Sequence, residues 1–153
     1  MTTIVVYPWK VMYDYEATRN LYSGTEGGDA DRCECAYCRR FRNVRDEVYP
    51  QNVRTILERM GIDYKKESEV SQICEVEGRK RLYGGSFVFF GAVECLDQAY
   101  ERSEAPPGFY KEVEVSADFS WVFVNVEGPP YYGVPADRLC AEIVFRVKLI
   151  LDI

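Results

Sequence analysis

Three cysteines lie close together in the stretch 33–38, which reads Cys-Glu-Cys-Ala-Tyr-Cys. This spacing can bring three thiolates to one point, and zinc prefers tetrahedral coordination by thiolates. The stretch follows a glycine-rich segment and precedes a helical pattern, and a helix N-terminus lowers thiol pKa values and so favours bound thiolates. The pattern therefore indicates a zinc site formed by Cys33, Cys35 and Cys38.

The sequence identifies no fourth ligand for that zinc ion. The chain has no histidine and no second Cys-x-x-Cys motif, which leaves Asp29, Asp31, Glu34 or a distant cysteine. Because paired Cys-x-x-Cys motifs are the more specific zinc signature, two other interpretations of the three cysteines stay open. They are free thiols packed at a helix start, or a redox-active or nucleophilic cysteine.

The absence of histidine also bears on enzymatic activity. It removes the usual general base, the Ser-His and Cys-His nucleophile pairs, and every His-ligated metal site. Carboxylates, tyrosines and lone thiolates remain available for catalysis. The composition therefore favours a protein that is not an enzyme and keeps a thiol-dependent enzyme as an alternative.

A basic segment follows the cysteines. Residues 32–66 carry nine basic and five acidic side chains, although the whole chain has a formal net charge of −6. The net charge argues against non-specific attraction to nucleic acid or to anionic membranes. The basic segment itself could form a contact face, or it could pair with the acidic remainder of the chain. The candidate interaction residues are Arg39, Arg40, Arg42 and Arg45.

The elements that position these residues follow from the apolar pattern. Two apolar stripes at helical spacing, separated by Pro50, predict two helices between about residues 36 and 60. Gly61 is suited to ending the second helix. The stripes are Tyr37, Phe41, Val44 and Val48, and then Val53, Ile56, Leu57 and Met60.

Alternation with a period of two predicts strands on both sides of the helices. Residues 23–31 are expected to form a loop, and Gly84-Gly85 indicates a bulge or a close backbone approach. No repeat or linker divides residues 1–153, so one domain is expected. Its class is α+β, a mostly antiparallel, twisted sheet of about six to seven strands with one layer of two helices. The strands are expected at 3–7, 11–18, 70–76, 79–95, 110–116, 118–126 and 141–153.

The same alternation places the other three cysteines. Cys74 and Cys95 fall on the apolar faces of their strands, and free cysteine packs as a small hydrophobic side chain. Both are therefore predicted to be buried. Cys140 falls opposite the apolar stripe of the last strand, which allows an exposed thiol.

Three short motifs resemble those of a known protein family. They are Cys33-x-Cys35-x-x-Cys38-Arg-x-Phe41, Met60-Gly61-Ile62-Asp63 and Tyr83-Gly84-Gly85-x-Phe87-x-Phe89-x-Gly91. In this combination the chain resembles a family of small, uncharacterised bacterial cytosolic proteins. The resemblance implies no established activity. It does imply that the cysteine cluster and the Tyr-Gly-Gly strand belong to one fold.

Composition also predicts the compartment and the kind of partner. No apolar run approaches the ~20 residues that span a bilayer, and the first residues lack the features of a signal peptide. A cytoplasmic protein with reduced cysteines and no membrane contact is therefore expected.

The first functional hypothesis is a non-enzymatic cytosolic binding protein that occupies a macromolecular partner, as immunity and inhibitor proteins do. It depends on the acidic composition and on the many aromatic side chains, which supply rigid contact area at interfaces. The expected partner is another protein. A nucleic-acid-associated module that uses the basic helix beside a zinc-bound cysteine cluster is one alternative, and a thiol-dependent enzyme is another. The sequence makes no prediction of oligomeric state.

Overall fold

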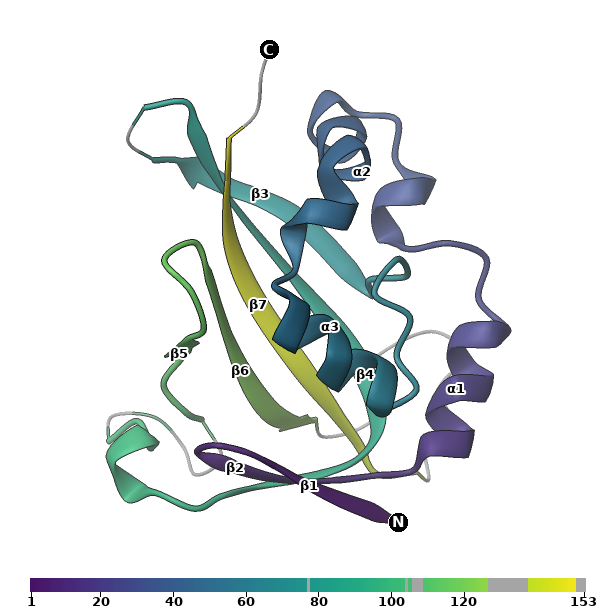
Figure 1. Ribbon diagram of the computed structural model, residues 1–153, viewed down its shortest axis with the longest axis vertical. Helices are drawn as coiled ribbons and strands as arrows, with labels where there is room; N and C mark the ends of the chain where they lie inside the picture. Colours follow the sequence, from purple (N-terminus) through teal and green to yellow (C-terminus); the bar gives the residue numbers. More distant parts are fainter. Residues whose placement is uncertain (77, 104, 106–108, 127–137, 151–153) are drawn as a thin grey trace.

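A computed structural model describes residues 1–76, 78–103, 105, 109–126 and 138–150 of the chain. These residues form seven strands in one twisted, open sheet and three α-helices (Figure 1). All strand pairs are antiparallel, so the predicted α+β class with an antiparallel sheet is confirmed. In chain order the elements, with η for short 3-10 helices, are β1 (Thr2–Val6), β2 (Trp9–Tyr13), α1 (Tyr15–Ser23), η1 (Asp29–Arg32), α2 (Ala36–Val48), α3 (Gln51–Arg59), β3 (Glu69–Glu75), β4 (Lys80–Cys95), η2 (Gln98–Tyr100), β5 (Val113–Glu114), β6 (Phe119–Val126) and β7 (Cys140–Ile150).

Strand β4 connects most of the sheet. The strand order is β1-β2-β4-β7-β6-β5, and β3 pairs with β4 outside this path. One edge of β4 pairs with β7, from Lys80 opposite Ile150 to Phe90 opposite Cys140. The other edge pairs with β3 in its first part and with β2 in its last part. Between these two partners, no strand of the described residues pairs with β4.

Helix α1 supplies partners for the backbone of β4 in this interval. The Thr18 hydroxyl accepts a hydrogen bond from Phe90 N at 3.2 Å, and the Tyr22 hydroxyl donates one to Val88 O at 2.8 Å. Both side chains are buried. Because buried backbone groups need partners, α1 takes a place that another strand would otherwise fill.

The strand predicted at 11–18 is wrong beyond Tyr13, because α1 begins at Tyr15. The Asp14 carboxylate accepts the Ala17 N–H at 3.0 Å, which satisfies one of the free donors in the first helical turn. The apolar pattern of the segment is compatible with either structure. The cap and the unpaired interval of β4 favour the helix, which lies outside the predicted layer of two.

Helices α2 and α3 confirm the two helices predicted after the cysteines. The buried face of α2 is displaced from the predicted stripe, since Tyr37 is 46% exposed and Cys38 is buried. The same displacement brings Arg45 into the buried face. The helix packs on the sheet through Phe41, whose ring centroid lies 5.7 Å from that of Tyr83 on β4.

The core between this helical layer and the sheet is rich in aromatic rings. Phe87 of β4 and Phe145 of β7 stack with 5.6 Å between ring centroids, and the Tyr49 ring contacts both. Gly85 makes room for this packing, because a Cβ there would lie 2.5 Å from Phe145 Cζ and 2.6 Å from Glu69 O. The close backbone approach predicted for the glycine pair is confirmed.

The segment before the cysteines is packed against the body of the protein, which corrects the loop predicted at 23–31. Helix η1 lies in this segment, and Ala30 is fully buried. The Asp29 N–H donates to Glu67 O at 2.9 Å. The chain that leads into the cysteine cluster is therefore held in place at Asp29 and Ala30.

The prediction for Cys74 is wrong, and the exposed thiol that the pattern allowed at Cys140 is not observed. Cys74 is exposed because it lies in the last part of β3, where consecutive residues on both faces of the strand are exposed. Cys140 is buried because it packs in a second, smaller core with Ala17 and Leu21 of α1. Cys95, predicted to be buried, is half-buried.

The C-terminal part follows the predicted strands with shorter bounds. The strands expected at 110–116 and 118–126 are observed as β5 and β6. The expected strand at 141–153 is observed as β7, and residues 151–153 lie outside the described part of the chain. Among the described helices, none combines the length and the apolar character that crossing a membrane requires.

Candidate metal centre

The three clustered cysteines lie at the start of α2. Cys33 and Cys35 have extended backbone conformations, and Cys35 is the N-cap of the helix. The Cys35 sulfur accepts a hydrogen bond from Cys38 N at 3.4 Å, a role that a side-chain oxygen usually plays at helix starts. The extended residues and the first helical turn thus bring the three side chains together.

The three Sγ atoms lie within 4.8 Å of one another. Zinc–sulfur bonds of about 2.3 Å in a tetrahedron place the sulfurs about 3.8 Å apart, so small side-chain movements would fit the group to an ion. Cys38 is buried, Cys33 is partly buried and Cys35 is exposed. The three cysteines therefore form a group that could hold a metal ion, with one side open to solvent.

The cysteines differ in acidity. The Cys38 N–H, followed by hydrogen bonds with the Cys33 and Cys38 thiols, lowers the pKa of Cys35 to about 7. Burial, followed by the neighbouring sulfurs, raises the pKa of Cys38 to about 12. The lowered pKa of Cys35 favours its thiolate, which is the form that binds metals and reacts as a nucleophile.

The carboxylates expected as fourth ligands do not join the sulfurs in the part of the chain that the structure describes. Asp29 accepts a backbone N–H of β3 at 3.0 Å, and Asp31 accepts Gly28 N at 2.7 Å. Glu34 forms an ion pair with Arg42, with 3.9 Å between Oε2 and Nη2. Each of these carboxylates thus has a partner other than the cysteine sulfurs.

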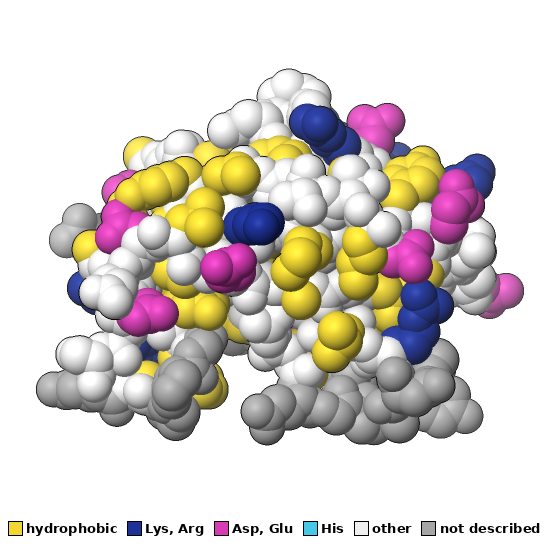
Figure 2. All heavy atoms as spheres, turned by 90° about the horizontal axis from the view of Figure 1, so that it is seen from below, with side chains coloured by type: hydrophobic (Ala, Val, Ile, Leu, Met, Phe, Trp, Pro, Cys, Tyr) yellow, Lys and Arg dark blue, Asp and Glu magenta, His cyan; other side chains and the backbone are white. Residues whose placement is uncertain are grey.

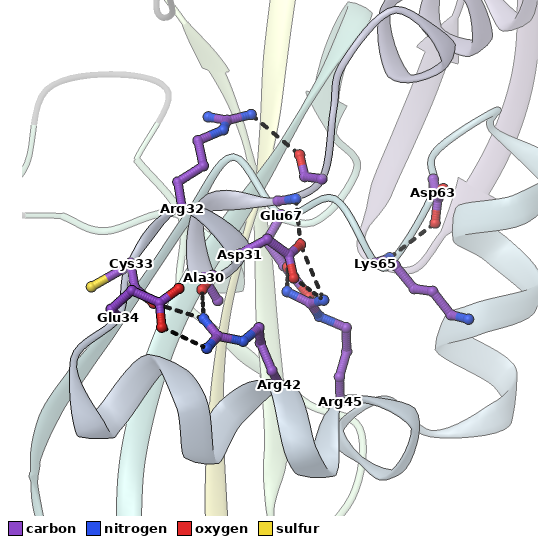
Figure 3. Close-up of polar contacts among 12 residues, drawn as sticks. Ala30, Asp31, Arg32, Cys33, Glu34, Arg42, Arg45, Asp63, Lys65 and Glu67 are labelled. Atoms are coloured by element: carbon purple, nitrogen blue, oxygen red, sulfur yellow. Dashed lines mark hydrogen bonds and ion pairs between the residues drawn. The ribbon is translucent and has the colours of Figure 1, made fainter.

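Arg42 fixes the backbone that enters the cluster. Its Nη1 donates to Cys33 O at 2.7 Å and also to Ala30 O. Figure 3 shows the Cys33 sulfur pointing away from this guanidinium. Arg42 therefore positions the main chain of a candidate ligand and leaves its sulfur free to face the other cysteines.

Arg45 forms a second polar cluster one turn further along α2 (Figure 3). Its guanidinium binds Glu67 through two hydrogen bonds, Nε to Oε1 at 3.1 Å and Nη2 to Oε2 at 3.0 Å, and it also lies 3.1 Å from Asp31 Oδ1. The Tyr49 hydroxyl donates to Glu67 Oε1 at 3.0 Å. The Glu67 side chain is fully buried, and a buried carboxylate persists in a fold when it is paired in this way.

The titration of this second cluster reflects its burial. Burial raises the pKa of Glu67 against the opposing effect of Arg45. Burial also raises the pKa of Tyr49 well above its usual range, so the hydroxyl remains a hydrogen-bond donor to the carboxylate. At Asp31, burial is outweighed by the Gly28 N–H and by Arg45, which together lower the pKa.

The four predicted interaction residues divide into two pairs. Arg42 and Arg45 are engaged inside the protein, as described above, whereas Arg39 is exposed and Arg40 is partly exposed. Sequence reasoning missed Glu67, which lies 22 residues from Arg45. No local pattern signals that pair, because the fold alone brings the two side chains together.

No family model matches the chain, and no curated protein and no solved structure matches it. The family resemblance of the three sequence motifs therefore stays a prediction.

Proposed function

We propose that the protein is a non-enzymatic cytosolic binding protein in which Cys33, Cys35 and Cys38 hold a zinc ion. The observation that carries the proposal is the convergence of three sulfurs within 4.8 Å at the start of α2. Thiolates in such a group suit zinc, which has no preferred geometry of its own and is commonly held in tetrahedral thiolate sites. The zinc ion would fix the first turn of α2 and the surface around it.

Support for a protein partner comes from the end of the sheet that carries β1. In the described residues β1 pairs only with β2, so its outer edge presents unpaired backbone groups. Val5 and Tyr7 at this end are 59% and 60% exposed. Figure 2 views the molecule from this end and shows apolar side chains interspersed with charged ones. An extended segment of a partner could add a strand to such an edge.

Elemental analysis of protein purified without a His-tag tests the zinc site, and we expect one zinc per chain. Structural zinc sites gain ~10–16 kcal/mol of binding free energy from about four ligands, so one ligand supplies roughly a quarter of it. Losing the thiolate in Cys35→Ser should therefore weaken zinc binding on the order of 100-fold. Cys74→Ser changes an exposed cysteine outside the cluster and should retain zinc. Wild-type protein that binds no zinc under reducing conditions would contradict the proposal.

Affinity capture from cells that naturally produce the protein tests the binding function. We expect a stoichiometric protein partner that is lost with Val5→Lys, because a lysine on an exposed edge opposes strand addition. Asn20→Lys adds the same charge at an exposed position of α1 and should keep the partner. Capture without any stoichiometric protein would remove this part of the proposal.

A thiol-dependent enzyme is the second candidate, and the exposure and low pKa of Cys35 favour it. Iodoacetamide labelling of the metal-free protein at neutral pH tests it. Faster labelling of Cys35 than of the exposed Cys74 is expected for an activated thiolate, whereas equal rates leave no activated nucleophile. The nucleic-acid alternative has less support, because Arg42 and Arg45 are engaged in internal contacts.

A further inference from the structure

Tetrahedral zinc needs a fourth ligand, and the described residues near the three sulfurs do not supply one. The carboxylate nearest in sequence belongs to Glu34, whose side chain is 86% exposed and pairs with Arg42. The other cysteines belong to β3, β4 and β7, and none of them joins the group. In the part of the chain that the structure describes, the fourth position is therefore left to a group from elsewhere.

That position is accessible from solvent. Cys38 lies on the buried side of the group and Cys35 on the exposed side. The Cys33 sulfur points away from the polar contacts of Arg42 (Figure 3). An ion held by the three sulfurs would thus be open to solvent on the side of Cys35.

The surroundings favour a thiolate as the arriving ligand. Zinc bound by three cysteines in structural sites is completed by Cys or His, and thiolates are among the ligands that select zinc. The Glu34 carboxylate lies between Cys33 and Cys35 in sequence, yet it is not part of the group that the three sulfurs form. The exposed Arg39 in the first turn of α2 supplies positive charge that offsets part of the negative charge of an added thiolate.

We propose that the zinc site of Cys33, Cys35 and Cys38 is completed by a thiolate from outside this chain, supplied by a small thiol or by a cysteine of a protein partner. The inference depends on the zinc site proposed above. On binding, the thiol releases its proton to the solvent and its sulfur replaces a water molecule on the ion, so no electron is transferred. A partner cysteine bound in this way would join metal binding and partner recognition at one surface.

Cobalt substitution of the full-length protein tests the inference, because the sulfur-to-cobalt absorbance reports how many thiolates are bound. Reduced protein, freed of reductant under argon, is loaded with Co²⁺ and titrated with 2-mercaptoethanol. Three thiolates become four, so the absorbance should rise by roughly one third to a plateau. Cys74→Ser protein should respond in the same way. Acetate or imidazole at equal concentration should not prevent the rise.

The possible outcomes separate this inference from the zinc proposal. Absorbance that thiol leaves unchanged overturns the inference, because the site then takes no thiolate from outside the chain. A dimer that forms on cobalt loading, seen by sedimentation, and no longer responds to thiol also overturns it, because a second copy of this chain then fills the fourth position instead of a small thiol or a different protein. Failure to bind one cobalt per chain contradicts the zinc site instead. Titration with a short peptide that has one cysteine among glutamates distinguishes the two sources of the thiolate. Tighter binding of the peptide than of 2-mercaptoethanol indicates a cysteine of a protein partner. Equal binding of the two indicates a small thiol.

Discussion

The two polar clusters of α2 differ in how completely their groups are paired. At the N-terminal end, three sulfurs lie within 4.8 Å of one another and one of the cysteines is exposed. Further along the helix, Arg45 binds Glu67 through two hydrogen bonds, and Tyr49 adds a third. In the buried cluster, the charged and polar groups therefore satisfy one another within the protein. In the cysteine cluster, by contrast, three sulfur atoms remain that could bind a metal ion.

The paired cluster has a structural role that follows from what it connects. Arg45 joins α2 to η1 through Asp31 and to the segment before β3 through Glu67. The segment around Gly28 packs closely on this pair, because a Cβ at Gly28 would lie 2.6 Å from Glu67 Oε2. Breaking the paired cluster should therefore reduce stability, whereas breaking the cysteine cluster should reduce metal binding.

The largest loss of unfolding free energy is expected for Arg45→Met, which leaves the buried Glu67 carboxylate without its positively charged partner. Removing one partner of a buried ion pair typically costs about 3 to 5 kcal/mol of unfolding free energy. Urea unfolding at pH 7 measures the loss. The double variant Arg45→Met/Glu67→Gln should recover part of it, because the unpaired charge is then gone.

Arg39→Met is the matched control for this variant. It removes the same charge from an exposed position of the same helix, where substitutions usually change stability by less than about 0.5 kcal/mol. If Arg45→Met were no more destabilising than Arg39→Met, the paired cluster would have no special structural role and the comparison between the two clusters would fail.

A smaller loss of unfolding free energy is expected for Gly28→Ala, which adds a methyl group next to Glu67. The nearest atoms include Glu67 N at 2.8 Å and Lys65 O at 3.0 Å, and main-chain atoms cannot move aside as a flexible side chain can. Overpacking of this kind costs about 1 to 3 kcal/mol. Gly24→Ala, whose added Cβ would meet its nearest atom at 3.4 Å, should change stability little. Zinc content should be unchanged in both variants, and its loss in Gly28→Ala would show that the two clusters are coupled.

Much of the fold could be predicted because its apolar patterns are long and regular. The two stripes before Gly61 predict α2 and α3, and the alternation from residue 141 predicts β7. Helix α1 was missed because the segment 11–18 also alternates like a strand. That error also explains why the exposed thiol allowed at Cys140 is not observed, since α1 covers the sheet face on which Cys140 lies. The exposure of Cys74 follows from the last part of β3 being exposed on both faces, which the alternation of apolar and polar residues does not signal.

The candidate metal site could be predicted in part because its three cysteines are close in sequence. Local spacing fixes which sulfurs can meet, and the structure brings those three together. The roles of the arginines could not be predicted in the same way. Arg45 lies on the helix face that packs inward, and its partner Glu67 is 22 residues away, so only the tertiary fold distinguishes it from the exposed Arg39.

The smallest expected effect is on the pH dependence of stability. It distinguishes Asp31 from Glu67, the two carboxylates that pair with Arg45. The pKa of Asp31 is lowered in the folded protein, so its contribution to stability is present above its unfolded pKa of about 3.9 and is lost as the pH falls through the folded value. The pKa of Glu67 is raised by burial. Its contribution therefore has the opposite sign, present in acid and lost as the pH rises through the folded value.

Asp31→Asn isolates the first of these contributions. Because Asp31 is partly exposed, the variant should lose less than about 1 kcal/mol at neutral pH. The wild type and the variant should then converge in urea unfolding below about pH 4, where Asp31 is protonated in the unfolded chain and begins to be protonated in the folded one. A difference that stays constant down to pH 3 would show that Asp31 acts through hydrogen bonds that do not need its charge. The fully buried Glu67 would then be the only carboxylate in the paired cluster whose ionisation affects stability.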